Sequence, residues 1–470
     1  MSYDTERSKE QLRRFETPIG NFIGRYRKQR PTFILFPGGM VSQLTRATEP
    51  FHHDLRRFDY ATVWLDWTIL DYAANQMQMH GDEDSDENII ISDGALSLFG
   101  FTPYDRFLAW CDEHHINWFV FGWDWRRRLE CTVAFFSRNF LPTFRKRVMD
   151  ASGGDDPLCD LTLIGRSFGG MVVKLILDAG GDHIAKIWRA ITVATPFYGY
   201  GGQLHRFFKG EPYLNWYYGT SRMAQIISSM LGVYTLQFLD YDTYRRDKGL
   251  LEKEPDYPLR DYPSRDAQSR APADPCNPTQ QANSFRYPRA DWFKRAELEH
   301  ARGIYRQVAV PLTDPAVRQK FYNFRGVRYR NGTLIKDTVN SQTWGWVQRD
   351  FDPDRSGSPI TDDPGGPGDD TIPAWSARLA STPADNVRTL KGTINHMFLM
   401  DADETLIELG KLVGSKLTTQ VQIRGALGTG QTDAASPQKT LEFLRDLHGV
   451  VRHERAARAY RAHFTRQQLR

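Results

Sequence analysis

The feature that most constrains the fold of this chain is the segment Gly165-Arg166-Ser167-Phe168-Gly169, which separates an apolar run from a helical pattern. Residues 161–164 form a short continuous apolar run that is typical of a buried strand. Apolar positions between 171 and 179 recur at helical spacing. Two glycines permit a tight turn between these elements. The pattern predicts a strand, a sharp turn and a helix, with the serine hydroxyl raised above the end of a sheet.

Further apolar runs predict strands at 32–36, 61–65, 118–122 and 190–194, and helical patterns cover 104–115 and 169–187. Alternation of strand and helix favours an α/β fold, with a mostly parallel central sheet flanked by helices. Strand-like sequence resumes at 320–327. The pair Asn331-Gly332 then predicts a hairpin turn. Residues 404–413 have a helical pattern.

Five segments follow from these patterns. The alternation stops after Gly199, where an aromatic-rich and then Pro- and Asp-rich stretch indicates an excursion from the sheet, either a cap or a mobile loop. We predict a polar lead-in at 1–30, a first core part at 31–199, a cap or lid insertion at 200–310, a second core part at 311–435 and a basic helical tail at 436–470.

Charge and cysteine content narrow the class of protein. Lys and Arg number 61 against 57 acidic residues, a formal charge of +4, which argues against a dedicated nucleic-acid binder. The four cysteines form no CxxC pair and no metal-ligand spacing. The first 30 residues contain no apolar signal region, and no stretch reaches the length of a transmembrane helix. We therefore expect a reduced, cytoplasmic protein.

The turn serine points to acyl chemistry. A serine hydroxyl is a weak nucleophile and needs a base, normally histidine, oriented by a carboxylate. After this type of turn the chain order is serine, acid, histidine. His396 lies between a turn and an apolar helix start, whereas the three later histidines lie in or beside the charged tail. Either Asp369 or Asp370 could orient the imidazole; an Asx turn is the structural alternative.

An oxyanion site would need two backbone N–H groups. One would come from Phe168, which follows the serine, and the other from the loop after the first strand, where Gly39 is our choice and Met40 the alternative. This chemistry requires no metal and no organic cofactor.

Five motifs together resemble the lecithin:cholesterol acyltransferase and group XV phospholipase family of α/β-hydrolases. They occur in family order, as Pro37-Gly38 with Ser42 and Leu44, Val63-Trp64-Leu65-Asp66, Trp123-Asp124-Trp125-Arg126, Gly165 to Gly170, and Gly368-Asp369-Asp370-Thr371. The resemblance spans about residues 31–400 and implies an α/β-hydrolase fold. It also implies that the first aspartate of the last motif, Asp369, is the acid.

The chain departs from the family pattern at two places, and its aromatic motifs supply candidate substrate-binding residues. Thr195 to Gly199 is similar to the segment after the next family strand, but the family often has histidine where this chain has Arg166, and no cysteine pair matches the disulfide-tied lid of secreted animal members. Trp125 and Arg126 suit a pocket wall or lid anchor, or equally an arginine stacked on an aromatic ring to fix a loop. The candidate substrate-binding residues are Met40, Trp125, Phe197, Trp216 and Tyr217.

These observations predict a serine-dependent ester hydrolase that forms an acyl-enzyme on a lipid-like or apolar ester. The alternatives are an acyltransferase with the same residues, a serine peptidase, and a catalytically silent scaffold that acts as a binding protein. The aromatic insertion would also suit peripheral contact with a membrane surface, and the oligomeric state stays open.

Overall fold

The computed structural model describes residues 5–46, 62–64, 77–79, 90–96, 102–200, 203, 206–207, 220–236, 241–254, 294–334, 367–393 and 395–414 of the 470-residue chain. Among the helices of these residues, none combines the length and the apolar character that crossing a membrane would require.

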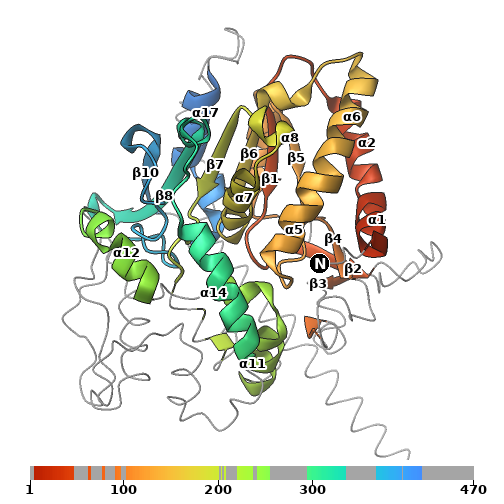
Figure 1. Cartoon of the computed structure of the whole chain (residues 1–470). Coiled ribbons are helices and arrows are strands. Elements are labelled where there is room, and N and C mark those ends of the chain that lie inside the picture. Colours follow the sequence, from red (N-terminus) through yellow and green to blue (C-terminus); the bar gives the residue numbers. More distant parts are fainter. Residues whose placement is uncertain are drawn as a thin grey trace, which may run out of the picture.

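A mostly parallel sheet forms the centre of the molecule (Figure 1). Its strand order is β10-β8-β7-β6-β1-β5, and every neighbouring pair in this order is parallel. The apolar runs of the sequence form its central strands. The bounds are β1 (Thr32–Phe36), β5 (Asn117–Val120), β6 (Leu161–Arg166), β7 (Arg189–Val193), β8 (Phe321–Arg330) and β10 (Val387–Gly392).

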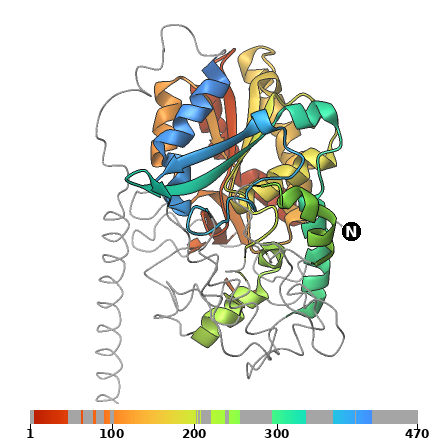
Figure 2. The same ribbon diagram turned by 90° about the vertical axis from the view of Figure 1, so that its left-hand side faces the viewer.

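Helices cover both faces of this sheet (Figures 1 and 2). On one face lie α4 (Asp105–Glu113) and α17 (Asp403–Val413); on the other lie α5 (Leu129–Phe135), the π-helical turn η1 (Phe136–Phe140), α6 (Leu141–Ser152) and α7 (Phe168–Ala179). Shorter helical segments complete these connections: η2 (Pro157–Asp160), α8 (Asp182–Ala185), η6 (Ala384–Asn386) and η7 (His396–Asp401). The chain is therefore an α/β protein with a mostly parallel central sheet flanked by helices, which confirms that part of the predicted fold class.

The direction of the connections reverses between β1 and β6. From β1 the chain passes through α4 to β5 on one side, then returns past β1 to β6 and continues to β7 and β8 on the other. In open α/β sheets, the crevice outside the carboxyl ends of the strands at such a switch point is where ligands bind. The two loops at this point are the one that follows β1, at residues 37–40, and the turn at Ser167.

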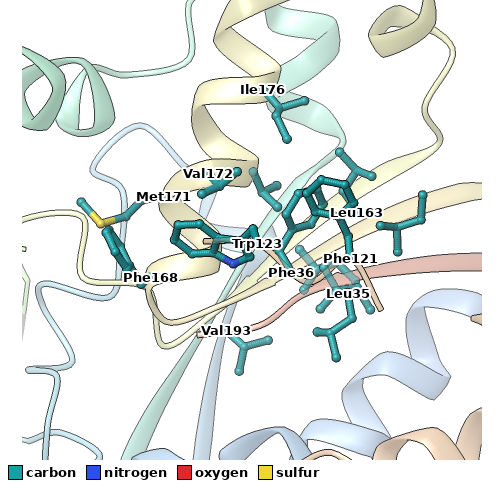
Figure 3. Packing of buried hydrophobic residues seen from close by; sticks show 14 of the residues in the cluster. Leu35, Phe36, Phe121, Trp123, Leu163, Phe168, Met171, Val172, Ile176 and Val193 are labelled. Carbon is teal, nitrogen blue, oxygen red and sulfur yellow. The ribbon is translucent and has the colours of Figure 1, made fainter. Parts of the chain in front are cut away.

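The core beneath this crevice is apolar and aromatic. Leu35, Phe36 and Leu163 from the strands are buried together with Val172 and Ile176 of α7 (Figure 3). Because α7 is buried along almost its whole length, from Phe168 to Leu177, it is fixed firmly against the sheet. The turn that precedes α7 therefore has a rigid support on both sides.

The polar lead-in is helical and contributes to the core. It forms α1 (Thr5–Arg14) and α2 (Glu16–Arg25), and it buries Phe15, Ile19 and Phe22. The ring of Phe15 stacks on Phe121 at a centroid distance of 5.2 Å. Each such burial contributes about 1.5–3 kcal/mol to folding. The segment 5–25 is thus part of the packed structure, which its high polar content concealed.

The predicted strand at 61–65 belongs to another sheet. β3 (Thr62–Trp64) pairs antiparallel with β2 (Ser42–Arg46), which also pairs antiparallel with β4 (Ile90–Ala95). The predicted strand is thus present, and its place in a separate sheet was not predicted, because a short apolar run does not reveal its pairing partner. The hairpin prediction is confirmed: β9 (Thr333–Leu334) pairs antiparallel with β8 across Asn331 and Gly332, which have φ of 51° and 77°. The helix predicted at 404–413 is α17.

The described part of the segment between β7 and β8 is helical. Its elements are α11 (Thr220–Ser229), η3 (Gly232–Leu236), α12 (Tyr241–Leu251), α14 (Arg295–Ala309) and α15 (Pro315–Gln319). In Figure 1, α11 and α14 extend below the sheet, at the end where β1 leads toward β2. The segment is fastened to the loop before α5, because Gly232 N–H donates to Arg126 C=O at 2.7 Å and Arg128 forms a two-point ion pair with Glu297.

Candidate active site

Ser167 occupies a strained turn between β6 and α7. Its backbone has φ 53° and ψ −123°, in a region that a non-glycine residue seldom adopts. The surrounding glycines make the turn possible. A Cβ on Gly165 would overlap the backbone of Gly170, one on Gly169 would overlap the C=O of Phe36, and one on Gly170 would overlap the Thr195 side chain. The local sequence thus allows the end of β1 and the turn to approach within van der Waals contact.

Three side chains meet above this turn. Nε2 of His396 lies 2.9 Å from Oγ of Ser167, and Nδ1 of the same ring lies 2.7 Å from Oδ2 of Asp369. All three residues are buried. The serine follows β6, the aspartate follows the hairpin of β8, and the histidine follows β10. In this order a neutral imidazole can accept the serine proton while the carboxylate holds its other N–H.

The two adjacent aspartates have different surroundings. Asp369 Oδ1 accepts the backbone N–H groups of Ile372 at 2.7 Å and Thr371 at 3.2 Å, so its carboxylate forms an Asx turn and faces the imidazole at the same time. Asp370 accepts the Thr371 hydroxyl at 3.0 Å and lies 3.8 Å from Arg328. The structure therefore brings Asp369, and not Asp370, to the imidazole ring.

Two aromatic residues hold the loop after β1 against the turn. The indole N–H of Trp123 donates to Pro37 C=O at 3.0 Å, and the hydroxyl of Tyr104 accepts the Gly38 N–H at 3.1 Å. The Trp123 ring also packs on Phe168 at a centroid distance of 5.1 Å, and both are buried beside α7 (Figure 3). The first tryptophan of the Trp123 to Arg126 motif thus joins this loop to the serine turn.

Two backbone N–H groups at this point are available to a ligand. Phe168 begins α7, so its N–H has no partner inside the helix. Gly39 packs directly on Phe168, where a Cβ would lie 3.2 Å from the ring. Within the described residues neither N–H donates a hydrogen bond to the protein. Met40, the alternative donor, is half-buried with φ 66°.

The imidazole is held in its neutral form by its environment. Burial lowers the pKa of His396, the Asp369 carboxylate opposes this effect, and the positive charge of Arg166 lowers the pKa further. Arg206 has a smaller effect in the same direction. A neutral ring near pH 7 is the state in which Nε2 can accept a proton.

The turn that carries His396 is tied to α4 by Asp401, the last residue of η7. Oδ1 of Asp401 accepts the N–H of Phe107 at 2.9 Å, and Oδ2 accepts that of Arg106 at 3.4 Å. Burial raises the pKa of Asp401 from an ordinary 3.8 to about 7. Sequence reasoning missed this residue, because it lies 294 positions from the helix start that it contacts.

We expect Asp401 to make the stability of the protein depend on pH. Between its unfolded and folded pKa the folded state retains a proton that the unfolded state has lost. Its contribution is therefore full below about pH 4 and falls by about 1.4 kcal/mol per pH unit as the pH rises toward 7. Denaturant unfolding between about pH 4 and 8 should show this decline in the wild type and a flatter profile in Asp401→Asn. Glu113→Gln, at the exposed end of α4, is the control, since Glu113 is not among the groups that shift the pKa of Asp401. Parallel profiles for Asp401→Asn and wild type would contradict the assignment.

The structure places Trp125 and Phe197, two of the predicted substrate-binding residues, inside packed regions of the protein. Trp125 is fully buried, and its neighbour Arg126 forms a two-point pair with Asp124 at 2.9 and 2.8 Å. With the bond from Gly232, this favours the anchor interpretation of the motif. Phe197 is fully buried and its ring meets Phe321 at 6.2 Å, so packing accounts for it. Trp216 and Tyr217 lie outside the described residues.

In the part of the chain that the structure describes, no group of three or more His, Cys, Asp or Glu side chains is arranged to hold a metal ion.

Comparisons with known proteins do not assign this chain to a family. No protein-family model and no curated protein matches the sequence. A solved structure with a similar chain is "The crystal structure of Tle4-Tli4 complex", at 13% identity and a TM-score of 0.43, with 84% of this chain and 99% of that chain covered. A likeness of this size bears on neither the fold nor the activity of the present chain.

Proposed function

We propose that this chain is a serine-dependent ester hydrolase that works through an acyl-enzyme on a lipid-like or apolar ester. The observation that carries the proposal is the hydrogen-bonded series from Asp369 through His396 to Ser167, with separations of 2.7 and 2.9 Å. The strained serine conformation adds support, because backbone strain of this kind clusters at functional sites. The resemblance of the sequence motifs to the lecithin:cholesterol acyltransferase and group XV phospholipase family agrees with this chemistry. We propose membership of that family together with the activity.

The mechanism follows from the positions of the groups. His396 takes the proton of Ser167 as the hydroxyl attacks the ester carbonyl, and Asp369 stabilises the imidazolium that forms. The negative oxygen of the tetrahedral intermediate accepts hydrogen bonds from the N–H groups of Phe168 and Gly39, with the positive end of the α7 dipole behind Phe168. His396 then protonates the leaving alcohol. Water, activated by the same imidazole, releases the acid and restores the serine.

An active-site label tests the chemistry directly. A fluorophosphonate probe should attach to wild-type protein at Ser167, as located by peptide mass mapping, and should not label Ser167→Ala. Turnover of p-nitrophenyl esters of increasing chain length, measured against peptide substrates, then separates an esterase with an apolar site from a peptidase. Absence of both labelling and turnover would favour the silent binding scaffold and reject the proposal.

We expect hydrolysis to exceed acyl transfer in water. Both outcomes share the acyl-enzyme, and they differ in whether the site excludes water and holds a second alcohol. The measurement is a partition experiment, in which an ester donor is supplied with and without a long-chain alcohol or sterol, and free acid and new ester are quantified. Free acid should dominate. Predominant new ester at modest acceptor concentration would replace hydrolase by acyltransferase, with the same residues in the same roles.

A further inference from the structure

Arg166, the residue before the serine, is a buried cation at the junction of three active-site segments. It ends β6 and is only 4% exposed. One guanidinium nitrogen donates to the backbone C=O of His396. The other terminal nitrogen lies against Gly38, where a Cβ would be 2.5 Å away. The side chain therefore spans from the serine turn to the histidine turn and passes beneath the loop that follows β1.

This cation has no compensating anion among the residues that the structure describes. Its hydrogen-bond partner is a neutral carbonyl, its Nε has no hydrogen-bond partner, and no carboxylate of the described residues forms an ion pair with it. Burying a charge without an opposite charge is expensive, and a side chain that only braces a loop would not need one. A neutral side chain could brace the loop without this cost, so the presence of the charge itself calls for an explanation.

We propose that Arg166 is a positioning residue that holds the His396 turn and the Gly38 loop against Ser167 and supplies a fixed positive charge to the site. The proposal rests on the proposed ester chemistry. In this proposal the positive charge of Arg166 affects both the imidazole of His396 and the developing oxyanion. A cation near the imidazole disfavours the imidazolium before substrate binds, and so keeps His396 ready as a base at lower pH. The same charge lies behind the loop whose N–H would face the developing oxyanion, where fixed charges act strongly because water is excluded.

The charged groups that face His396 determine how its pKa should respond when Arg166 is replaced. They are Asp369, whose carboxylate meets the ring, Asp370, whose Oδ1 lies 3.4 Å from the His396 backbone N–H, and the cations Arg166 and Arg206. Asp369 raises the pKa of the ring, and the two arginines lower it. Removing the charge of Arg166 should consequently raise the pKa of His396.

The test compares Arg166→Met and Arg166→Lys with wild type. Arg166→Met should lower kcat by about 100-fold with little change in KM, since it loosens groups that act in the transition state. It should also move the acid limb of the pH–rate profile upward by about one pH unit. Arg166→Lys retains the charge and should restore the acid limb, but not the full kcat, because an ammonium cannot contact both segments.

Arg189→Met is the matched control, and NMR titration of His396 is a second measurement of the effect on its pKa. Arg189 also donates to a backbone carbonyl, that of Leu412, but it begins β7 and so lies at the opposite end of the sheet from Ser167. Arg189→Met should lower stability without moving the acid limb. If Arg166→Met does not fold, Arg166→Gln carries the same test. The pKa of His396 can also be followed by NMR of histidine-labelled protein, with the resonance assigned through His396→Gln.

The NMR readout separates this proposal from the proposed function. Wild-type protein without ester turnover would count against the hydrolase, while the titration of His396 would still report on Arg166. An unchanged His396 pKa in the charge-free variants overturns the role of Arg166, whatever happens to kcat. An upward shift in Arg166→Met that Arg166→Lys reverses supports it.

Discussion

Ser167→Ala is expected to lower ester turnover by about 10⁴-fold or more, and to leave the fold intact. The hydroxyl is the only group at this turn placed to receive the acyl chain, with its oxygen 2.9 Å from Nε2 of His396. The variant should fold because the Ser167 side chain does not cap α7. The turn instead depends on glycines and on the burial of α7, which alanine leaves unchanged. His396→Ala should cause a loss of the same size, because without the base the serine is a weak nucleophile.

The measurement is kcat/KM on a p-nitrophenyl ester, with circular dichroism and thermal unfolding to verify the fold. Ser152→Ala is a matched control, because Ser152 is also buried and its hydroxyl bonds only to backbone groups at the end of α6. The control should retain activity within about twofold. Near-wild-type turnover by Ser167→Ala would show that another residue is the nucleophile.

Asp369→Asn should cost about 10⁴-fold in kcat, whereas Asp370→Asn should cost less than about tenfold. The hydrogen bonds of Asp369 explain the size of the first effect. Its Oδ1 accepts two backbone N–H groups, so in the asparagine variant the amide oxygen must take that position. The NH₂ group then faces Nδ1 of His396 and donates to it. The ring is forced into the tautomer that carries its proton on Nε2, and this tautomer cannot accept the serine proton.

Asp370 is the internal control for charge and location. Its carboxylate is directed to the Thr371 hydroxyl and toward Arg328, and so its replacement leaves the tautomer unaffected. Rates for both variants on the same ester, with thermal unfolding measured alongside, decide the matter. Equal losses, or a larger loss for Asp370→Asn, would mean that the acid has been assigned to the wrong residue.

The sequence predicted what local patterns encode. The serine turn was identified because an apolar run, two glycines and a helical pattern occur together, and β8 to β9 because Asn331-Gly332 suits a tight turn. His396 and Asp369 followed from chain order, with the choice between the two aspartates supplied by family resemblance. The structure then brought these residues together, while their catalytic roles stay predictions.

The rest depended on contacts between distant segments. The burial of Phe15, Ile19 and Phe22 follows a helical spacing, but the charged residues on both sides of them, within 4–14 and 25–30, dominated the composition of the segment. β10 carries only one buried residue, Leu390, so its alternation was too weak to mark a strand. Arg166 was noticed only as a departure from a family motif, because its contacts with Gly38 and His396 join segments that no local pattern connects.

The wide spacing of the three site residues along the chain has a consequence for how activity is acquired. Ser167 and His396 are 229 positions apart, and the strands that carry Asp369 and His396 join the sheet last in chain order. During synthesis the N-terminal part emerges first, and it can pair β1, β5, β6 and β7 and form the serine turn without the rest. Such an intermediate displays a nucleophile that has no base. The arrangement required for the proposed hydrolysis is therefore completed only when β8 and β10 dock, and recovery of ester turnover during refolding should lag behind recovery of helical signal.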